Sequence, residues 1–102
     1  MPTKITLIFD NPIDPGAFES DYPELVNRAR SVPGLLKMET SKVWPKEDGT
    51  ATPAYRMIDL YFPDYEAANA PLGTPEAGAF FRRASELATG GMTGLFSDVE
   101  ES

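Results

Sequence analysis

The sequence predicts an α+β domain in which one antiparallel sheet carries two helices on a single face. Three observations lead to this prediction. Segments rich in β-branched and aromatic residues alternate with two amphipathic helical patterns, most prolines and glycines fall between the segments, and the order along the chain is β-α-β-β-α-β. This order is typical of the ferredoxin-like fold. The 102 residues fit a single domain, residues 1–102, and we find no internal repeat or linker.

The first third of the chain predicts one strand and one helix. Residues 4–9 (KITLIF) are mostly β-branched or aromatic and predict the first strand, and residues 10–16 have the Asn, Asp, Pro and Gly content of a turn. Residues 17–30 carry apolar side chains at spacings of three and four, which indicates a helix, and Pro33-Gly34 ends it. The apolar positions are Phe18, Tyr22, Leu25, Val26 and Ala29.

Pro23 lies within this helical pattern, where proline would remove a backbone hydrogen bond. We therefore expect the regular helix to begin near Asp21. Asp21 would then be the N-cap, Pro23 would lie in the tolerant first turn, and Glu24 would complete a capping box.

The remaining elements follow in order. Residues 35–44 (LLKMETSKVW) alternate as a long second strand, residues 45–53 predict a loop, and residues 55–62 (YRMIDLYF) predict the third strand. A short helical turn is expected at residues 64–70, and residues 92–96 predict the fourth strand.

The last helix begins after Thr74, which is expected to cap it with Pro75 in the first helical position, and it ends at Gly90-Gly91. Its apolar stripe predicts contact with the sheet. The stripe consists of Ala77, Phe80, Phe81, Ala84, Leu87 and Ala88.

The composition limits the chemistry that the chain can perform. It has no histidine and no cysteine, so Ser-His-Asp and Cys-His nucleophile systems and zinc or haem sites with those ligands are excluded, and we expect neither a metal nor a cofactor. The net charge of −7 argues against nucleic acid or an anionic membrane as a partner. We find neither a bilayer-spanning apolar segment nor a signal peptide, so a cytoplasmic protein is expected.

One face of the predicted sheet lacks helices. On the third strand, Tyr55, Met57, Asp59 and Tyr61 point to the same side. If Met38 and Trp44 of the second strand share this open face with them, a monomer would expose a large apolar patch. A second copy of the same sheet would cover it most simply, so we expect a homodimer.

Three stretches together resemble the EthD family. They are residues 18–35 (FESDYPELVNRARSVPGL), residues 55–62, and Thr74-Pro75-Glu76-Ala77-Gly78 followed by Thr89-Gly90-Gly91 and Leu95-Phe96. The resemblance covers nearly the whole chain and implies a dimeric α/β-barrel with a central cavity. It also implies a setting in the degradation of ethyl tert-butyl ether and similar compounds. Many EthD-like proteins have a histidine in the first helix, which this chain lacks, so no mechanism that depends on it carries over.

Asp59 is the candidate catalytic residue. It lies among apolar and aromatic residues and matches a position that is commonly acidic in the family. A carboxylate facing a partly dry cavity is harder to ionise and can act as a general base. The alternative is a structural acid that pairs with Arg56, Lys42 or a group of the partner chain.

Trp44, Tyr55, Met57 and Tyr61 are candidate ligand-binding residues for a flat or apolar compound, although the same side chains could simply form the dimer interface. The functional prediction is a protein that binds a small hydrophobic or aromatic metabolite in the barrel cavity. It could be a cofactor-independent isomerase, cyclase or oxygenase of catabolism or xenobiotic degradation. The alternative is a non-catalytic accessory or ligand-binding protein with a filled cavity.

Overall fold

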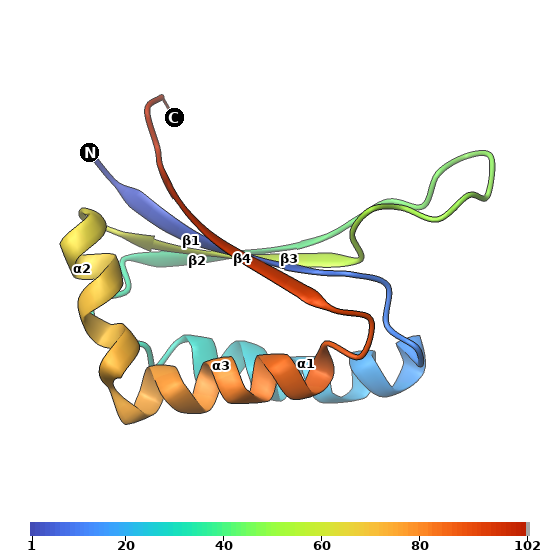
Figure 1. The fold of residues 1–102 in the computed structure, drawn as a ribbon, viewed down its shortest axis with the longest axis horizontal. Helices are drawn as coiled ribbons and strands as arrows, with labels where there is room; N and C mark the ends of the chain where they lie inside the picture. Colours follow the sequence, from blue (N-terminus) through green and yellow to red (C-terminus); the bar gives the residue numbers. More distant parts are fainter. Residues whose placement is uncertain (102) are drawn as a thin grey trace.

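The computed structural model describes residues 1–101 and confirms the predicted α+β architecture. Strands β1 (Thr3–Phe9), β2 (Lys37–Lys42), β3 (Arg56–Phe62) and β4 (Met92–Asp98) form one antiparallel sheet in the order β2-β3-β1-β4. Figure 1 shows both long helices, α1 and α3, on the same side of this sheet. The other side has no helix, as the ferredoxin-like order requires.

Helix α1 (Pro15–Ala29) begins earlier than predicted. Asp14 is its N-cap, with a side-chain oxygen that accepts a hydrogen bond from the Ala17 amide at 3.1 Å, and Pro15 occupies a first-turn position. Pro23 lies inside the helix, so the predicted start near Asp21 is wrong. Buried apolar side chains on both sides of Pro23 hold the two halves of the helix against the sheet, which offsets the missing backbone hydrogen bond.

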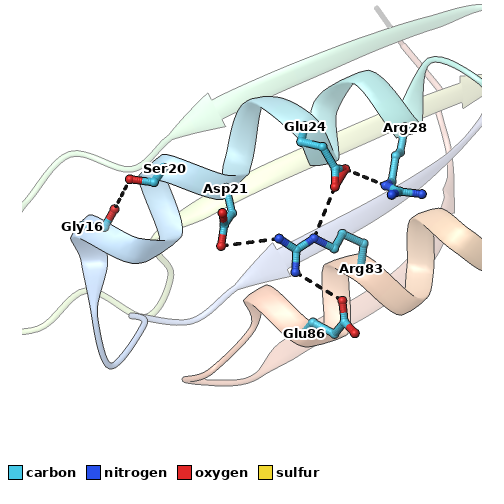
Figure 2. Close-up of polar contacts among 7 residues, drawn as sticks. All are labelled: Gly16, Ser20, Asp21, Glu24, Arg28, Arg83 and Glu86. Carbon is cyan, nitrogen blue, oxygen red and sulfur yellow. Dashed lines mark hydrogen bonds and ion pairs between the residues drawn. The ribbon is translucent and has the colours of Figure 1, made fainter.

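The predicted capping box of Asp21 and Glu24 is also wrong, because both carboxylates contact Arg83 of helix α3 (Pro75–Leu87). The two N···O distances are both 3.4 Å, and Glu86 lies 3.2 Å from the same guanidinium. Figure 2 shows Arg83 between the two helices with these three carboxylates around it. The acids therefore join α1 to α3 instead of beginning a helix.

The segment between β3 and α3 agrees with the prediction of a short helical turn. Asp64 caps α2 (Tyr65–Asn69), which continues into the 3-10 helix η1 (Ala70–Gly73). Thr74 then caps α3 as expected, and its hydroxyl accepts a hydrogen bond from the Ala77 amide at 3.3 Å.

Gly90 and Gly91 follow α3 and bring the start of β4 beside the end of β1. A side chain on Gly90 would put Cβ 1.9 Å from the backbone oxygen of Asn11, so only glycine fits. Gly91 has a φ of 110° and its carbonyl accepts a hydrogen bond from the Asp10 amide at 3.0 Å.

The hydrophobic core fills the space between the sheet and the helices. On β1 and β3, alternate residues face the helices and are almost fully buried. These are Ile5, Leu7, Phe9, Ile58, Leu60 and Phe62. They pack against the buried stripe of α1 and against Phe80 and Ala84 of α3.

Strand β2 is shorter than the predicted residues 35–44, although its ladder extends by one hydrogen bond at each end. The Leu36 amide donates to the Tyr61 carbonyl at 2.8 Å, and the Val43 amide donates to the Tyr55 carbonyl at 3.0 Å. Beyond this point residues 44–54 project from the body of the domain as an arm (Figure 1).

Among residues 1–101, every helix is too short or too polar to span a membrane. In the same residues, no group of three or more acidic, histidine or cysteine side chains is arranged to hold a metal ion.

Candidate functional site

Asp59 lies at the centre of the open sheet face. The register places it opposite Thr6 of β1 on one side and Glu39 of β2 on the other. Opposite residues of antiparallel strands share a face, so these three side chains point away from the helices. Lys4 and Tyr61, the next pair along the same face, complete its polar centre.

The two contacts of Asp59 go to a single carboxylate oxygen. The Thr6 hydroxyl donates to Asp59 Oδ1 at 2.5 Å, and Lys4 Nζ lies 3.6 Å from the same atom. Within residues 1–101, Asp59 Oδ2 accepts no hydrogen bond, and the side chain is 14% exposed. Arg56 and Lys42, the cations named as alternatives from the sequence, pair with Glu19 instead.

Tyr61 extends this centre toward β2. Its hydroxyl donates to Glu39 Oε1 at 2.5 Å, and this hydrogen bond is the main reason that the pKa of Tyr61 is raised to about 12. Lys37 Nζ lies 4.5 Å from the centroid of the Tyr61 ring, and Lys4 Nζ lies 5.8 Å from it. The ring is therefore flanked by two ammonium groups.

A pocket of about 240 Å³ adjoins Tyr61. Tyr61 and Lys37 are register partners on the open face, so the pocket lies at the end of that face. Its walls are Pro2, Leu36, Lys37, Tyr61 and Val99. An aromatic floor beside an ammonium group suits a compound with an apolar body and a polar or acidic end.

The other predicted ligand-binding residues do not all reach this site. Met57 lies on the open face with Asp59, opposite Ile8 of β1. Tyr55 does not, because it packs edge-on against Phe18 of α1, with ring centroids 5.3 Å apart, on the helix side. Trp44 is 87% exposed at the base of the arm. The structure therefore brings Asp59, Met57 and Tyr61 together and leaves Tyr55 and Trp44 elsewhere.

The open face is more polar than the sequence predicted, so the expected large apolar patch is wrong. Met38 packs against the core instead of facing outward, and polar side chains occupy most of the remaining positions. The face consists of Lys37, Glu39, Ser41, Met57, Asp59, Tyr61, Lys4, Thr6, Ile8, Thr93, Leu95 and Ser97. The strand alternation was assigned correctly for Met57, Asp59 and Tyr61 but not for Tyr55, and β2 has the opposite orientation from the one that the apolar patch required.

A second polar cluster lies on the helix side and was not singled out from the sequence. Arg56 binds Glu19 of α1 through two hydrogen bonds, Nε to Oε2 at 2.9 Å and Nη2 to Oε1 at 2.6 Å. This pairing is the main cause that lowers the pKa of Glu19 to about 2. The guanidinium also stacks over Tyr22, whose buried hydroxyl has no hydrogen-bond partner among residues 1–101. The polar–apolar alternation of β3 did not predict this cluster, because Arg56 is a charged residue at a position of the strand that faces the core.

Comparisons with known proteins agree with this fold. No family model matches the chain. The chain is 29% identical over 98 residues to an uncharacterized 11.0 kDa protein in the thcB-thcC intergenic region of Rhodococcus erythropolis, covering 95% of this chain and 94% of that protein.

Three solved structures are also similar. An ethyl tert-butyl ether degradation (EthD) family protein from Bacillus halodurans has a TM-score of 0.88 at 24% identity, with 97% of this chain and 99% of that chain covered. SnoaB, a cofactor-independent oxygenase from Streptomyces nogalater, has a TM-score of 0.66 at 13% identity, with 99% and 94% covered. A dimeric ferredoxin-like protein of unknown function from Jannaschia sp. has a TM-score of 0.64 at 16% identity, with 97% and 100% covered.

The similarity to the EthD family protein extends over nearly the whole of both chains, as the resemblance in the sequence predicted. At these identities, the structures establish that the chain has the ferredoxin-like fold of these proteins.

Proposed function

We propose that this protein is a homodimer that binds a small hydrophobic or aromatic metabolite between its two open sheet faces, with Asp59 in contact with the bound compound. The position of Asp59 carries this proposal. It is a mostly buried carboxylate at the centre of the uncovered face, and one of its two oxygens accepts no hydrogen bond within residues 1–101. That oxygen is available to a ligand.

The proposed reaction class follows from the groups around this oxygen. Asp59 would remove or return a proton on the ligand as a general acid–base. Lys4 and the lysine-flanked Tyr61 would lie near a negative charge that develops on the ligand. Cofactor-independent isomerisation, cyclisation or oxygenation in catabolism uses this kind of chemistry, and the similar fold of an enzyme described as a cofactor-independent oxygenase supports it.

The dimer is supported by the fold likeness to a ferredoxin-like protein described as dimeric. The open face also carries two lysines and two carboxylates near its centre, so that a second copy of the face offers groups of both signs. An interface of this kind buries roughly 2,000 Å² or more.

A non-catalytic accessory role is the second candidate, and a specific observation favours it. The polar groups of the face already pair with one another, Asp59 with Thr6 and Lys4, and Tyr61 with Glu39. A face that satisfies its own polar groups could close against a second copy without leaving room for a ligand.

Native mass spectrometry of freshly purified protein separates the two candidates. The enzyme proposal expects a dimer that retains a small molecule, and denaturation should release that molecule for identification. Asp59→Asn should lose it, whereas Asp21→Asn, the same change in the helical cluster of Figure 2, should retain it. The accessory role would be supported if the parent dimer retains no molecule and if Asp59→Asn binds metabolites to the same extent as the parent.

Thermal stability provides a second test of the role of Asp59. Asparagine keeps an acceptor for Thr6 and removes the carboxylate charge, so the melting temperature of the ligand-free protein should stay the same or rise. A loss of several degrees in ligand-free Asp59→Asn would mean that the Lys4 pair is structural, because breaking a partly buried ion pair leaves one charge unpaired. That result would end the catalytic assignment of Asp59.

A further inference from the structure

A second pocket lies on the helix side of the sheet, between β4 and α3, and we call it the α3–β4 pocket. Its volume is about 360 Å³. Residues of β1, η1, α3 and β4 line it: Ile5, Leu7, Leu72, Phe81, Met92, Gly94, Leu95 and Phe96. None of these side chains is charged. The sulfur of Met92, a weak acceptor, is their only polar atom.

Glycine at position 94 keeps this pocket open. Gly94 lies opposite Leu7 on the helix-facing side of β4, between Met92 and Phe96. A Cβ atom there would lie 3.3 Å from Leu7 Cδ2, so any larger side chain would occupy space over the floor of the pocket. Phe96, which is 39% exposed, forms part of the rim and packs against Tyr65 of α2 at 5.4 Å between ring centroids.

The size and lining of the pocket select its occupant. The pocket is open to solvent at its rim, where Leu95 and Phe96 are partly exposed, and an apolar molecule bound there would remove its apolar walls from water. The α3–β4 pocket has about 360 Å³ and a wholly apolar lining, so it is large enough for a compound of about two fused rings. A charged group would lose its hydration there without gaining a partner.

We infer that the α3–β4 pocket binds an uncharged, apolar small molecule of about two fused rings. The site is separate from Asp59, because the sheet lies between them. Leu7 forms the floor of this pocket, whereas the preceding residue, Thr6, contacts Asp59 on the opposite face. The inference does not depend on the proposed function, and a monomer would contain the complete site, since all of its walls belong to one chain.

Methyl-resolved NMR of the intact protein with naphthalene as the probe tests this inference. We expect saturable shifts at the methyl groups of Leu7, Leu72 and Met92 and no shift at Ile8 or Met57, which lie on the open face. 1-Naphthoate, which adds one carboxylate to the same ring system, should bind at least tenfold more weakly.

Two leucine substitutions on β4 sharpen the test. Gly94→Leu places a side chain over Leu7 and should weaken naphthalene binding at least tenfold. Thr93→Leu is the matched control, because Thr93 lies opposite Ile8 on the open face, and it should change affinity less than twofold. If Gly94→Leu fails to fold, Leu72→Trp fills the pocket from η1 and should give the same loss.

Saturable shifts at Leu7, Leu72 and Met92 that disappear in the filled variants would establish the site. Absence of saturable shifts would overturn it, and so would shifts centred on Met57 and Ile8. Naphthalene binding that persists unchanged in both filled variants would also overturn it. Loss of a retained ligand in Asp59→Asn is a separate result, since that change leaves the α3–β4 pocket intact.

Discussion

The two faces of the sheet are built from the same strands but are held together differently. On β1, Ile5, Leu7 and Phe9 face the helices and are nearly fully buried, whereas Lys4 and Thr6 face away from them and form polar contacts with Asp59. The helix-covered face is completed by its own chain, and its apolar side chains contribute to stability through burial. On the open face, Asp59 of β3 pairs with Thr6 and Lys4 of the neighbouring strand β1.

The same contrast holds for the two buried or half-buried carboxylates that pair with a cation. Glu19 binds Arg56 through two hydrogen bonds on the helix side, which uses both of its oxygens. Asp59 uses one oxygen for both Thr6 and Lys4 on the open side. A carboxylate with both oxygens engaged is suited to a structural role, whereas one with an oxygen free is suited to ligand contact.

The largest expected effect is on the helix-covered face. Leu60 is fully buried, so Leu60→Ala should lower the free energy of unfolding by about 2–5 kcal/mol. Because its contacts lie within one chain, the loss should be the same at every protein concentration. Urea unfolding at several concentrations measures it, with Ile58→Val as a milder control at about 0.5–1.5 kcal/mol. A concentration-dependent loss for Leu60→Ala would mean that this core is shared between subunits.

The open face should respond through association. Met57 lies on that face, and Met57→Arg would place an uncompensated charge between two packed sheets. We expect the parent protein to scatter light as twice the 11.2 kDa chain mass and Met57→Arg to scatter as a single chain. Ser85→Arg, on an exposed position of α3, is the control and should remain dimeric. A parent protein that is monomeric at micromolar concentration would refute the face-to-face dimer.

The sequence was sufficient to predict the element order and the core positions of β3, since these depend on local periodicity and on turn residues. It placed the start of α1 too late, because Asp14-Pro15 was assigned to a turn while Pro23 was assumed to lie near a helix end. In the structure, Asp14 caps the helix and buried side chains surround Pro23, so the helix begins at Pro15.

Parts of the site depend on packing between elements that are distant in sequence. Tyr55 precedes the regular part of β3, so strand alternation did not determine its side, and its contact with Phe18 does. The α3–β4 pocket could not be predicted, since it is the space left between β1, η1, α3 and β4 once they pack. Asp59 was identified correctly as an outward-facing acid of β3, but its contacts with Thr6 and Lys4 depend on the register with β1.

The helix-side ion pair should appear in the pH dependence of stability. The pKa of Glu19 is lowered from 4.5 to about 2, so its pairing with Arg56 stabilises the folded protein above about pH 4.5 and is lost as the pH falls toward 2. The side chain is 34% exposed, so solvent screening limits the effect to about 1 kcal/mol or less. Glu19→Gln should therefore destabilise the protein at pH 6 and match the parent near pH 2, as measured by urea unfolding. An equal difference at both pH values would point to packing instead of charge.

The smallest expected effect is the titration of Tyr61 on the open face. Its hydrogen bond to Glu39 holds the proton on the phenol, and its pKa is raised from 10 to about 12. The folded protein therefore binds this proton more tightly than the unfolded chain, so the contribution to stability is present below pH 10 and is lost as the pH rises toward 12. In an alkaline ultraviolet titration, Glu39→Gln should move the ionisation of one tyrosine to lower pH. Tyr61→Phe should remove that transition from the titration, which assigns it. If the transition stays in place in Glu39→Gln, burial and the Asp59 carboxylate, and not the Glu39 carboxylate, keep the pKa of Tyr61 raised.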